Sequence, residues 1–88
     1  MQDTTRKVEE IGIVTDFFSH VSVAAIQLTG SLKVGDTILI QGHTTNVEQV
    51  VDSMQIEKQS VQEANAGDNI GIKLSERVRK HDKVLKAI

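Results

Sequence analysis

Short runs of β-branched and aliphatic residues, separated by polar turns, recur along this 88-residue chain. Val, Ile and Leu pack well on a half-buried pleated surface, so each run favours a strand. Turn signals fall between the runs at about the 8–12-residue intervals that are typical of sandwiches and barrels. The pattern predicts about six strands, at residues 8–14, 21–28, 36–41, 45–56, 69–74 and 83–88.

Two Gly-Asp pairs, Gly35-Asp36 and Gly67-Asp68, each lead into an apolar, β-prone segment. Glycine supplies the backbone freedom of a tight turn, and aspartate can accept hydrogen bonds from nearby backbone there. Proline, which often protects exposed sheet edges, is absent. Closing the sheet on itself would remove the need for that protection. We therefore expect an all-β fold, a small closed Greek-key-like β-barrel.

Three segments leave local details open. Val47, Val50, Val51 and Met54 have helix-like spacings, but β-branched residues dominate residues 45–56 and no capping residue frames a helix, which favours one long strand. The polar residues 57–66 fit either a loop or a single helical turn. Gly12 predicts a bend or bulge, and a slip in the alternation of residues 21–28 predicts either a bulge or a segment covered on both faces.

The length allows one domain, and we expect residues 1–7 to form a flexible N-terminal arm and residues 8–88 to form the barrel. Phe17 and Phe18 are the only aromatic residues, so the core must be aliphatic, with at least one of the two in it. Without cysteine the chain can form neither disulfides nor thiolate metal sites. The apolar runs are too short for a membrane span, and the polar N-terminus lacks the pattern of a signal peptide, which predicts a cytoplasmic protein.

The formal net charge of −2 hides an uneven distribution of charge. Residues 1–72 carry 4 basic and 10 acidic side chains, a balance of −6, whereas residues 73–88 carry 6 basic and 2 acidic ones, a balance of +4. An ordinary solvated surface can show such a distribution, but a clustered positive end can also attract an anionic partner.

Three arrangements that resemble catalytic or ligand sites fail on chemistry. Gly30 and Gly35 have the glycine spacing of a phosphate-binding loop, but Asp36 stands where that loop needs lysine. His20, His43 and His81 could combine with Asp16 or Asp82, yet no two histidines have the short spacing usual for a zinc site. Ser19, His20 and Asp16 are adjacent loop residues, not side chains converging from separate elements as a triad needs. We expect no enzyme activity, no metal and no cofactor.

A basic cluster near the C-terminus is the strongest candidate for function: Arg77, Arg79, Lys80 and Lys83. If the first three lie in a loop and Lys83 begins a strand, their charges can gather on one rim of the barrel and contact phosphates. Single-strand binders usually add aromatic platforms, and this chain has few. The cluster therefore favours weak RNA contact within a larger complex.

The order of several segments resembles the second domain of translational GTPases such as elongation factor Tu, over about residues 11–88. The segments are Gly12-Ile13-Val14, GSLKVGD, ILIQG, AGDNIGI and VRKHDKVLKAI. The chain is also similar to small stand-alone elongation-factor-like proteins and to a barrel at the end of some U32-type peptidases linked to RNA modification. The resemblance implies a β-barrel and, through the part this barrel plays in holding the aminoacylated end of tRNA, a contact surface that includes Asp68 and Asn69.

The chain also departs from that family in three respects. These residues hold no nucleotide-binding domain, so GTP hydrolysis is not implied. Ile11-Gly12 occupies the region of the family's Arg-Gly pair, and His81 stands where the last turn often has glycine.

Taken together, the residues and the resemblance predict a non-enzymatic binding module that contacts tRNA or other RNA, or proteins of the translation or RNA-modification machinery. The alternative is a protein-only partner subunit, or a barrel that self-associates through an exposed strand edge, without a nucleic-acid role. Neither reading involves a membrane or GTP.

Overall fold

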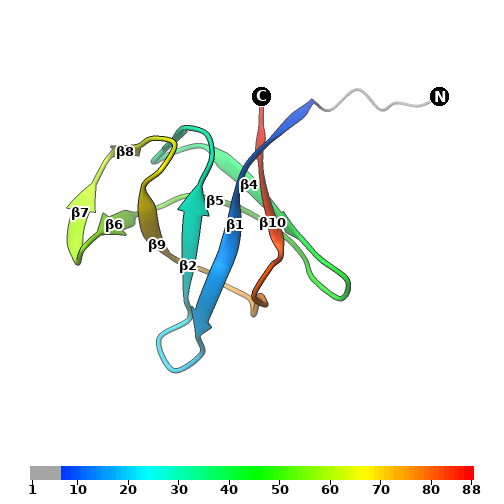
Figure 1. Cartoon of the computed structure of the whole chain (residues 1–88). Coiled ribbons are helices and arrows are strands. Elements are labelled where there is room, and N and C mark those ends of the chain that lie inside the picture. The colour runs from blue at the N-terminus through cyan, green and yellow to red at the C-terminus, as the bar shows by residue number, and fades with distance from the viewer. Residues whose placement is uncertain (1–6) are drawn as a thin grey trace.

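The computed structural model describes residues 7–88, which form ten strands and no helix. Eight strands make one curved sheet in the spatial order β5-β4-β10-β1-β2-β9-β6-β7, and two short strands, β3 and β8, pair separately (Figure 1). All pairings are antiparallel. The strands are β1 (Val8–Phe18), β2 (Val23–Leu28), β3 (Leu32–Lys33), β4 (Thr37–Gln41), β5 (Asn46–Val50), β6 (Met54–Ile56), β7 (Gln59–Val61), β8 (Glu63–Ala64), β9 (Asn69–Lys73) and β10 (Lys83–Ala87). The all-β prediction is confirmed, with more strands than expected. They are shorter than expected except for β1, which continues past the predicted end at residue 14 to Phe18.

The last strand, β10, lies between β1 and β4, so both ends of the chain meet in the middle of the sheet. The expected N-terminal arm falls almost entirely on residues 1–6, which lie outside the described residues. Lys7 is described, and its carbonyl accepts a hydrogen bond from the Ile88 N–H at 3.0 Å. Nowhere in residues 7–88 is there a helix with the length and apolar character needed to cross a membrane.

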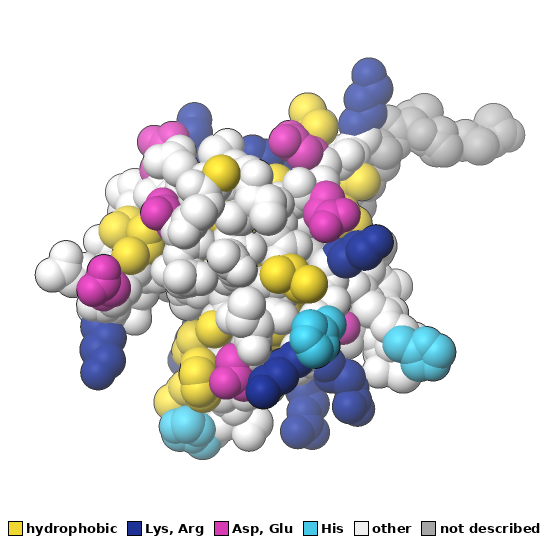
Figure 2. Space-filling view, viewed as in Figure 1, with side chains coloured by type: hydrophobic (Ala, Val, Ile, Leu, Met, Phe, Trp, Pro, Cys, Tyr) yellow, Lys and Arg dark blue, Asp and Glu magenta, His cyan; other side chains and the backbone are white. Residues whose placement is uncertain are grey.

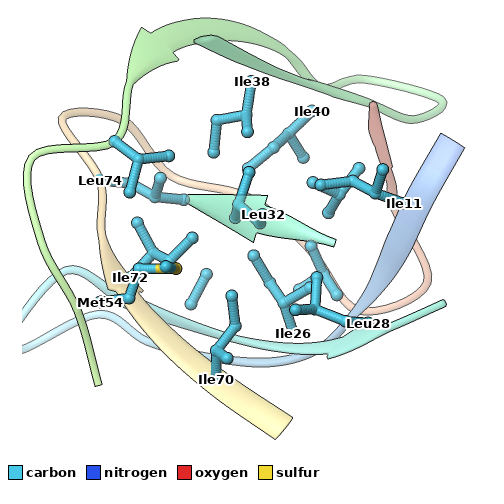
Figure 3. Close-up of a cluster of buried hydrophobic side chains, with 14 of the residues drawn as sticks. Ile11, Ile26, Leu28, Leu32, Ile38, Ile40, Met54, Ile70, Ile72 and Leu74 are labelled. Atoms are coloured by element: carbon cyan, nitrogen blue, oxygen red, sulfur yellow. The ribbon is translucent and has the colours of Figure 1, made fainter. Parts of the chain in front are cut away.

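One aliphatic core fills the concave side of the sheet (Figure 3). Alternate residues of each strand point inward, as the period of two requires: Ala24, Ile26 and Leu28 of β2 are buried, and so are Ile70 and Ile72 of β9. Leu32 of the short strand β3 reaches into the middle of this cluster and has no exposed surface.

The expected long strand at residues 45–56 is wrong, because the chain breaks between β5 and β6 at Val51–Ser53. Val51 and Met54 are both buried. A spacing of three cannot place two side chains on the same face of one strand, so the chain must leave regular strand geometry at Asp52 and Ser53. This break carries the chain from β5, at one end of the strand order, to β6 near the other end.

The loop or helical turn expected at residues 57–66 is also wrong. Residues 54–61 form a hairpin of β6 and β7, and the two turn residues, Glu57 and Lys58, have positive φ values of 50° and 68°. Positive φ at both central positions defines the type I′ turn that matches the twist of a two-residue hairpin. Asn-Gly usually marks such a turn, and Glu-Lys does not.

The bulge predicted at Gly12 is present, the bulge suggested for residues 21–28 is not, and β1 carries a second bulge that the sequence did not predict. The register of β1 against β10 shifts between Glu10 and Gly12, and its register against β2 shifts between Val14 and Asp16. Gly12 is therefore a bulge position, as predicted. The slip inferred for residues 21–28 arises because Val21 lies before β2, which itself alternates regularly.

Aspartate closes three turns in the same way, and two of them are the predicted Gly-Asp corners. In each turn the aspartate N–H donates to the carbonyl three residues earlier, and its Oδ2 accepts from the N–H of that same residue. The pairs are Lys33–Asp36, Asn65–Asp68 and Arg79–Asp82, with carboxylate contacts of 2.9, 2.8 and 2.9 Å. The residue before each aspartate has positive φ: 101° at Gly35, 94° at Gly67 and 75° at His81.

Candidate nucleic-acid interface

The segment between β9 and β10, residues 74–82, crosses one end of the sheet and carries most of the predicted basic cluster. Two buried side chains, Leu74 and Val78, anchor it to the core at 3% and 2% exposure. Backbone hydrogen bonds fix both ends, from Leu74 N–H to the Ser22 carbonyl at 2.8 Å and from His81 N–H to the Val14 carbonyl at 2.7 Å. The basic loop, as we call residues 75–82, is therefore held in one place.

Because Val78 points inward, Arg77 and Arg79 on either side of it point outward, and both are exposed. Lys80 in the following turn and Lys83 at the start of β10 are exposed as well. The structure thus places all four predicted cations at the same end of the barrel. Figure 2 shows Lys, Arg and His side chains together at the lower end of the molecule.

The buried carboxylate of Asp82, the last residue of the basic loop, helps to fix the backbone of this loop. Asp82 is only 6% exposed, and its Oδ2 accepts the Arg79 N–H at 2.9 Å. The turn between β4 and β5 passes close above it at Gly42, where an added Cβ would overlap the carboxylate. The buried aspartate therefore fixes the backbone from which Arg79 projects.

Strand register adds two residues that the sequence did not assign to the site. Phe18 of β1 pairs with Val23 of β2, and Val23 pairs with Lys73 of β9. Directly paired residues share a face of the sheet, and this row faces outward because the next row, Phe17, Ala24 and Ile72, packs into the core. Phe18 is 44% exposed. The basic end, defined as Phe18, Lys73, Arg77, Arg79, Lys80 and Lys83, therefore combines cations with an exposed aromatic ring.

The expectation that at least one phenylalanine belongs to the core is confirmed by Phe17. A sequence signal for Phe18 existed, since adjacent strand residues face opposite sides. The bulge in β1 determines which of the two phenylalanines faces outward. The strand register determines that Lys73 lies in the same row as Phe18, two strands away.

Asp68 and Asn69, the family-analogy site, lie at the other end of β9 from the basic loop. From Asn69 to Lys73 a strand rises about 13 Å, so the two candidate sites do not converge. The Asp68 carboxylate accepts the Asn65 N–H at 2.8 Å and closes a turn. Asn69 is exposed. The sequence assigned Asp68 to binding, and the structure gives its carboxylate a definite role in the turn.

Of the residues weighed for metal or triad chemistry, Asp16 was wrongly expected in a loop, because β1 continues through it to Phe18. The others lie between strands: Ser19, His20, His43, His81 and Asp82. Asp16 Oδ1 accepts the Phe17 N–H at 2.8 Å. Over residues 7–88, no three His, Asp or Glu side chains are grouped so that they could hold a metal ion. A shallow cavity of about 340 Å³ lies on the β6–β7 hairpin, lined by Ile56, Glu57, Gln59 and Val61.

Three known proteins are similar over most of this chain. An uncharacterized protease of Methanocaldococcus jannaschii is 52% identical over 80 residues, which are 90% of this chain and 19% of that protein. A collagenase of Porphyromonas gingivalis is 38% identical over 82 residues, 91% of this chain and 23% of the collagenase. The C-terminal domain of a Geobacillus thermoleovorans protein named as a U32 peptidase has the same fold, with a TM-score of 0.83 at 18% identity, covering 89% of this chain and 91% of that domain.

This chain spans about a fifth of the length of the curated relatives. The family described as elongation factor Tu domain 2 matches residues 25–85. That match runs from β2 to β10 and includes both Gly-Asp turns and the basic loop. The chain therefore belongs to the elongation factor Tu domain 2 family.

Proposed function

We propose that this chain is a non-catalytic module that binds single-stranded RNA through its basic end. The observation that carries the proposal is the meeting of five exposed cations with the exposed ring of Phe18 at one end of a rigid barrel. Lys and Arg attract phosphates regardless of sequence, and an aromatic face can stack any base. An unpaired strand offers both contacts, whereas the bases of a duplex are already stacked on one another.

In this proposal Arg77, Arg79, Lys80 and Lys83 contact backbone phosphates. Lys73 lies in the same outward row as Phe18, two strands away with Val23 between them, and contacts a phosphate next to the base that stacks on Phe18. The anchoring of residues 75–82 by Leu74 and Val78 favours binding, because little loop entropy is lost when the ligand arrives. The family relationship supports the same class of ligand, since the barrel of elongation factor Tu helps to hold the aminoacylated end of tRNA. Asp68 and Asn69 remain a second candidate contact by that analogy.

The module carries no reaction centre of its own in this proposal. The relatives are named as a protease and collagenases, but the shared region is about a fifth of each, and catalysis would reside in the rest. The working partners are then the translation or RNA-modification machinery in the cytoplasm, with RNA as the shared ligand.

The test is fluorescence anisotropy with a labelled single-stranded RNA and with tRNA, titrated with the full chain at several salt concentrations. Each phosphate neutralised on a single strand contributes about 0.7 to the slope of log affinity against log salt, so five contacts predict a slope of about −3.5. The triple variant Arg77→Glu, Arg79→Glu, Lys80→Glu should abolish binding.

The matched control makes the same change in net charge by reversing three exposed lysines away from the basic end, Lys7→Glu, Lys33→Glu and Lys58→Glu, and should bind as the unmodified chain does. Equal loss of binding in the control would mean that the triple variant loses RNA binding because of its net charge and not because of the position of the reversed residues. Binding that does not change with salt, or that survives the triple reversal, would refute the proposal.

A further inference from the structure

The outer side of the sheet carries five apolar residues across β1, β10, β4 and β5, beside Glu10, Thr37 and Glu48, where a solvent-facing sheet usually carries mostly polar residues. Pairing in register gives the row Glu10–Leu85–Leu39–Glu48, one residue from each strand. In the neighbouring row Val8 pairs with Ala87, and Thr37 pairs with Val50. Both rows face away from the core, since the alternate residues Ile38, Ile40 and Val84 fill it.

These outward side chains form one exposed patch. Val8 and Val50 are 42% and 50% exposed, and Leu85 and Ala87 are half-buried. Leu39 completes the patch at 9% exposure even though it points away from the core. We call the patch, defined by Val8, Leu39, Val50, Leu85 and Ala87, the outer apolar face. A contiguous apolar surface of this kind on a small domain marks an interaction site.

The outer apolar face lies where both chain ends leave the domain. Val8 begins β1, and Ile88, which is 77% exposed, follows Ala87 directly. Figure 1 shows the start of β1 and the end of β10 at the same end of the molecule. In the curated relatives the shared region is 19% and 23% of the protein, so the larger remainder of each relative continues from at least one of these ends. Its natural contact is the nearest apolar surface.

The charged residues at the edge of the outer apolar face indicate which kind of partner can bind there. Glu10 and Glu48 close the row at its two ends. Two copies packed face to face about a two-fold axis perpendicular to the strands would place Glu10 of one against Glu10 of the other, and like charges in an interface disfavour that pairing. An apolar surface with Lys or Arg at its rim matches both the leucines and the exposed Glu10 carboxylate.

We propose that the outer apolar face docks against a larger protein domain that has an apolar patch rimmed by Lys or Arg, of the kind that makes up the remainder of the longer relatives. This surface is separate from the basic end, so RNA binding and docking can occur together. The inference does not depend on the RNA-binding proposal, because it uses different residues.

The absence of cysteine from the chain allows a clean footprinting test. Residues 7–88 replace the matching region of the Methanocaldococcus jannaschii relative, in a full-length chimera. Val50→Cys reports on the outer apolar face, and Ser60→Cys on β7, which is exposed and outside the face, serves as the control. Alkylation at each position is followed by peptide mass spectrometry, in the chimera and in the isolated 88-residue chain.

We expect alkylation of Cys at position 50 to be about tenfold slower in the chimera than in the isolated chain, with position 60 unchanged within about twofold. Adding Leu85→Lys, or separately Ala87→Lys, should restore fast alkylation at position 50. Far-ultraviolet circular dichroism of the same variants in the 88-residue chain verifies that the barrel still folds.

Equal rates at position 50 in the chimera and the isolated chain would overturn the proposal. So would protection that appears in the isolated chain and grows with its concentration, which would identify a second copy as the occupant. Protection that persists in both folded lysine variants would also overturn it.

Discussion

Gly42 lies directly against the buried carboxylate of Asp82. A Cβ built at position 42 would overlap the Asp82 side chain at Oδ1 and Cγ. This approach joins the β4–β5 turn to the loop that carries the basic residues. A single contact between two non-adjacent turns therefore ties the shape of the candidate site to the stability of the barrel.

The variant Gly42→Ala should lower the free energy of unfolding by about 2 kcal/mol, because over-packing against a fixed group costs about 1–3 kcal/mol. Urea denaturation followed by far-ultraviolet circular dichroism measures the change. Gly71→Ala is the matched control, since a Cβ there would meet only a methyl group of Val23 at 3.4 Å. Equal stability of the two variants would contradict the close approach.

His81 occupies the position of glycine in the third aspartate-closed turn. Its φ of 75° lies in the left-handed region, which costs most residues about 1–2 kcal/mol. His81→Gly should raise stability by about 0.5 kcal/mol, since relief of that cost is offset by about 0.4–1 kcal/mol of added unfolded-state entropy. His81→Val should lower stability by more than about 1 kcal/mol, because a β-branched residue is a genuine outlier at positive φ. The thermal midpoints of the three proteins should rank Gly, His, Val.

These turns show how much the sequence reveals. Gly35-Asp36 and Gly67-Asp68 were recognisable as turns because glycine favours positive φ and aspartate can accept a hydrogen bond from the backbone. Residues 79–82 form the same turn, but the sequence does not indicate it, because histidine and not glycine precedes the aspartate. The hairpin turn at Glu57 and Lys58 was invisible for the same reason. A turn with positive φ can be predicted from the sequence only where a residue that favours positive φ, such as glycine or asparagine, occupies that position.

The candidate site was predictable in part for a different reason. Arg77, Arg79, Lys80 and Lys83 are close in sequence, so one loop was enough to gather them. Phe18, Val23 and Lys73 come together only through two strand pairings, and a bulge in β1 sets the register of the first. A one-residue slip would have moved every one of these side chains to the other face.

The type I′ turn at Glu57-Lys58 can be improved. Both residues have positive φ, and Asn-Gly adopts that geometry with the least strain. Replacing the pair, Glu57→Asn with Lys58→Gly, should raise the free energy of unfolding by about 1 kcal/mol, since each αL residue relieved returns up to about 1–2 kcal/mol. The measurement is urea denaturation, and a Glu57→Ala, Lys58→Ala variant, which keeps the strain, should gain nothing.

Gln49 of β5 holds the start of the basic loop with one amide group. Its Nε2 donates to the Lys73 carbonyl at 3.1 Å, and its Oε1 accepts the Ser75 N–H at 2.9 Å. Gln49→Ala should lower stability by about 1–2 kcal/mol, at about 1 kcal/mol per hydrogen bond, and should speed hydrogen exchange at the Ser75 amide. Gln49→Glu keeps the bond to Ser75 but places an oxygen against the Lys73 carbonyl, so it should lose stability while the Ser75 amide stays protected. Equal exchange at Ser75 in both variants would show that the amide does not fix the loop.

The two phenylalanines should separate stability from binding. Phe17 packs against the core whereas Phe18 is 44% exposed, although the two are adjacent in β1. Phe17→Ala should destabilise the barrel by about 2 kcal/mol, less than the 3–5 kcal/mol typical of a fully buried ring, and should leave RNA affinity unchanged at temperatures where the variant is folded. Phe18→Ala should leave stability within about 0.5 kcal/mol but weaken single-stranded RNA binding about tenfold, the loss of one stacked base at about 1–3 kcal/mol. Phe18→Trp should retain the affinity, since a larger ring still stacks. If Phe18→Ala binds RNA as tightly as the unmodified chain while the reversal of Arg77, Arg79 and Lys80 abolishes binding, then the basic end reads only phosphates, and a duplex should bind as well as a single strand.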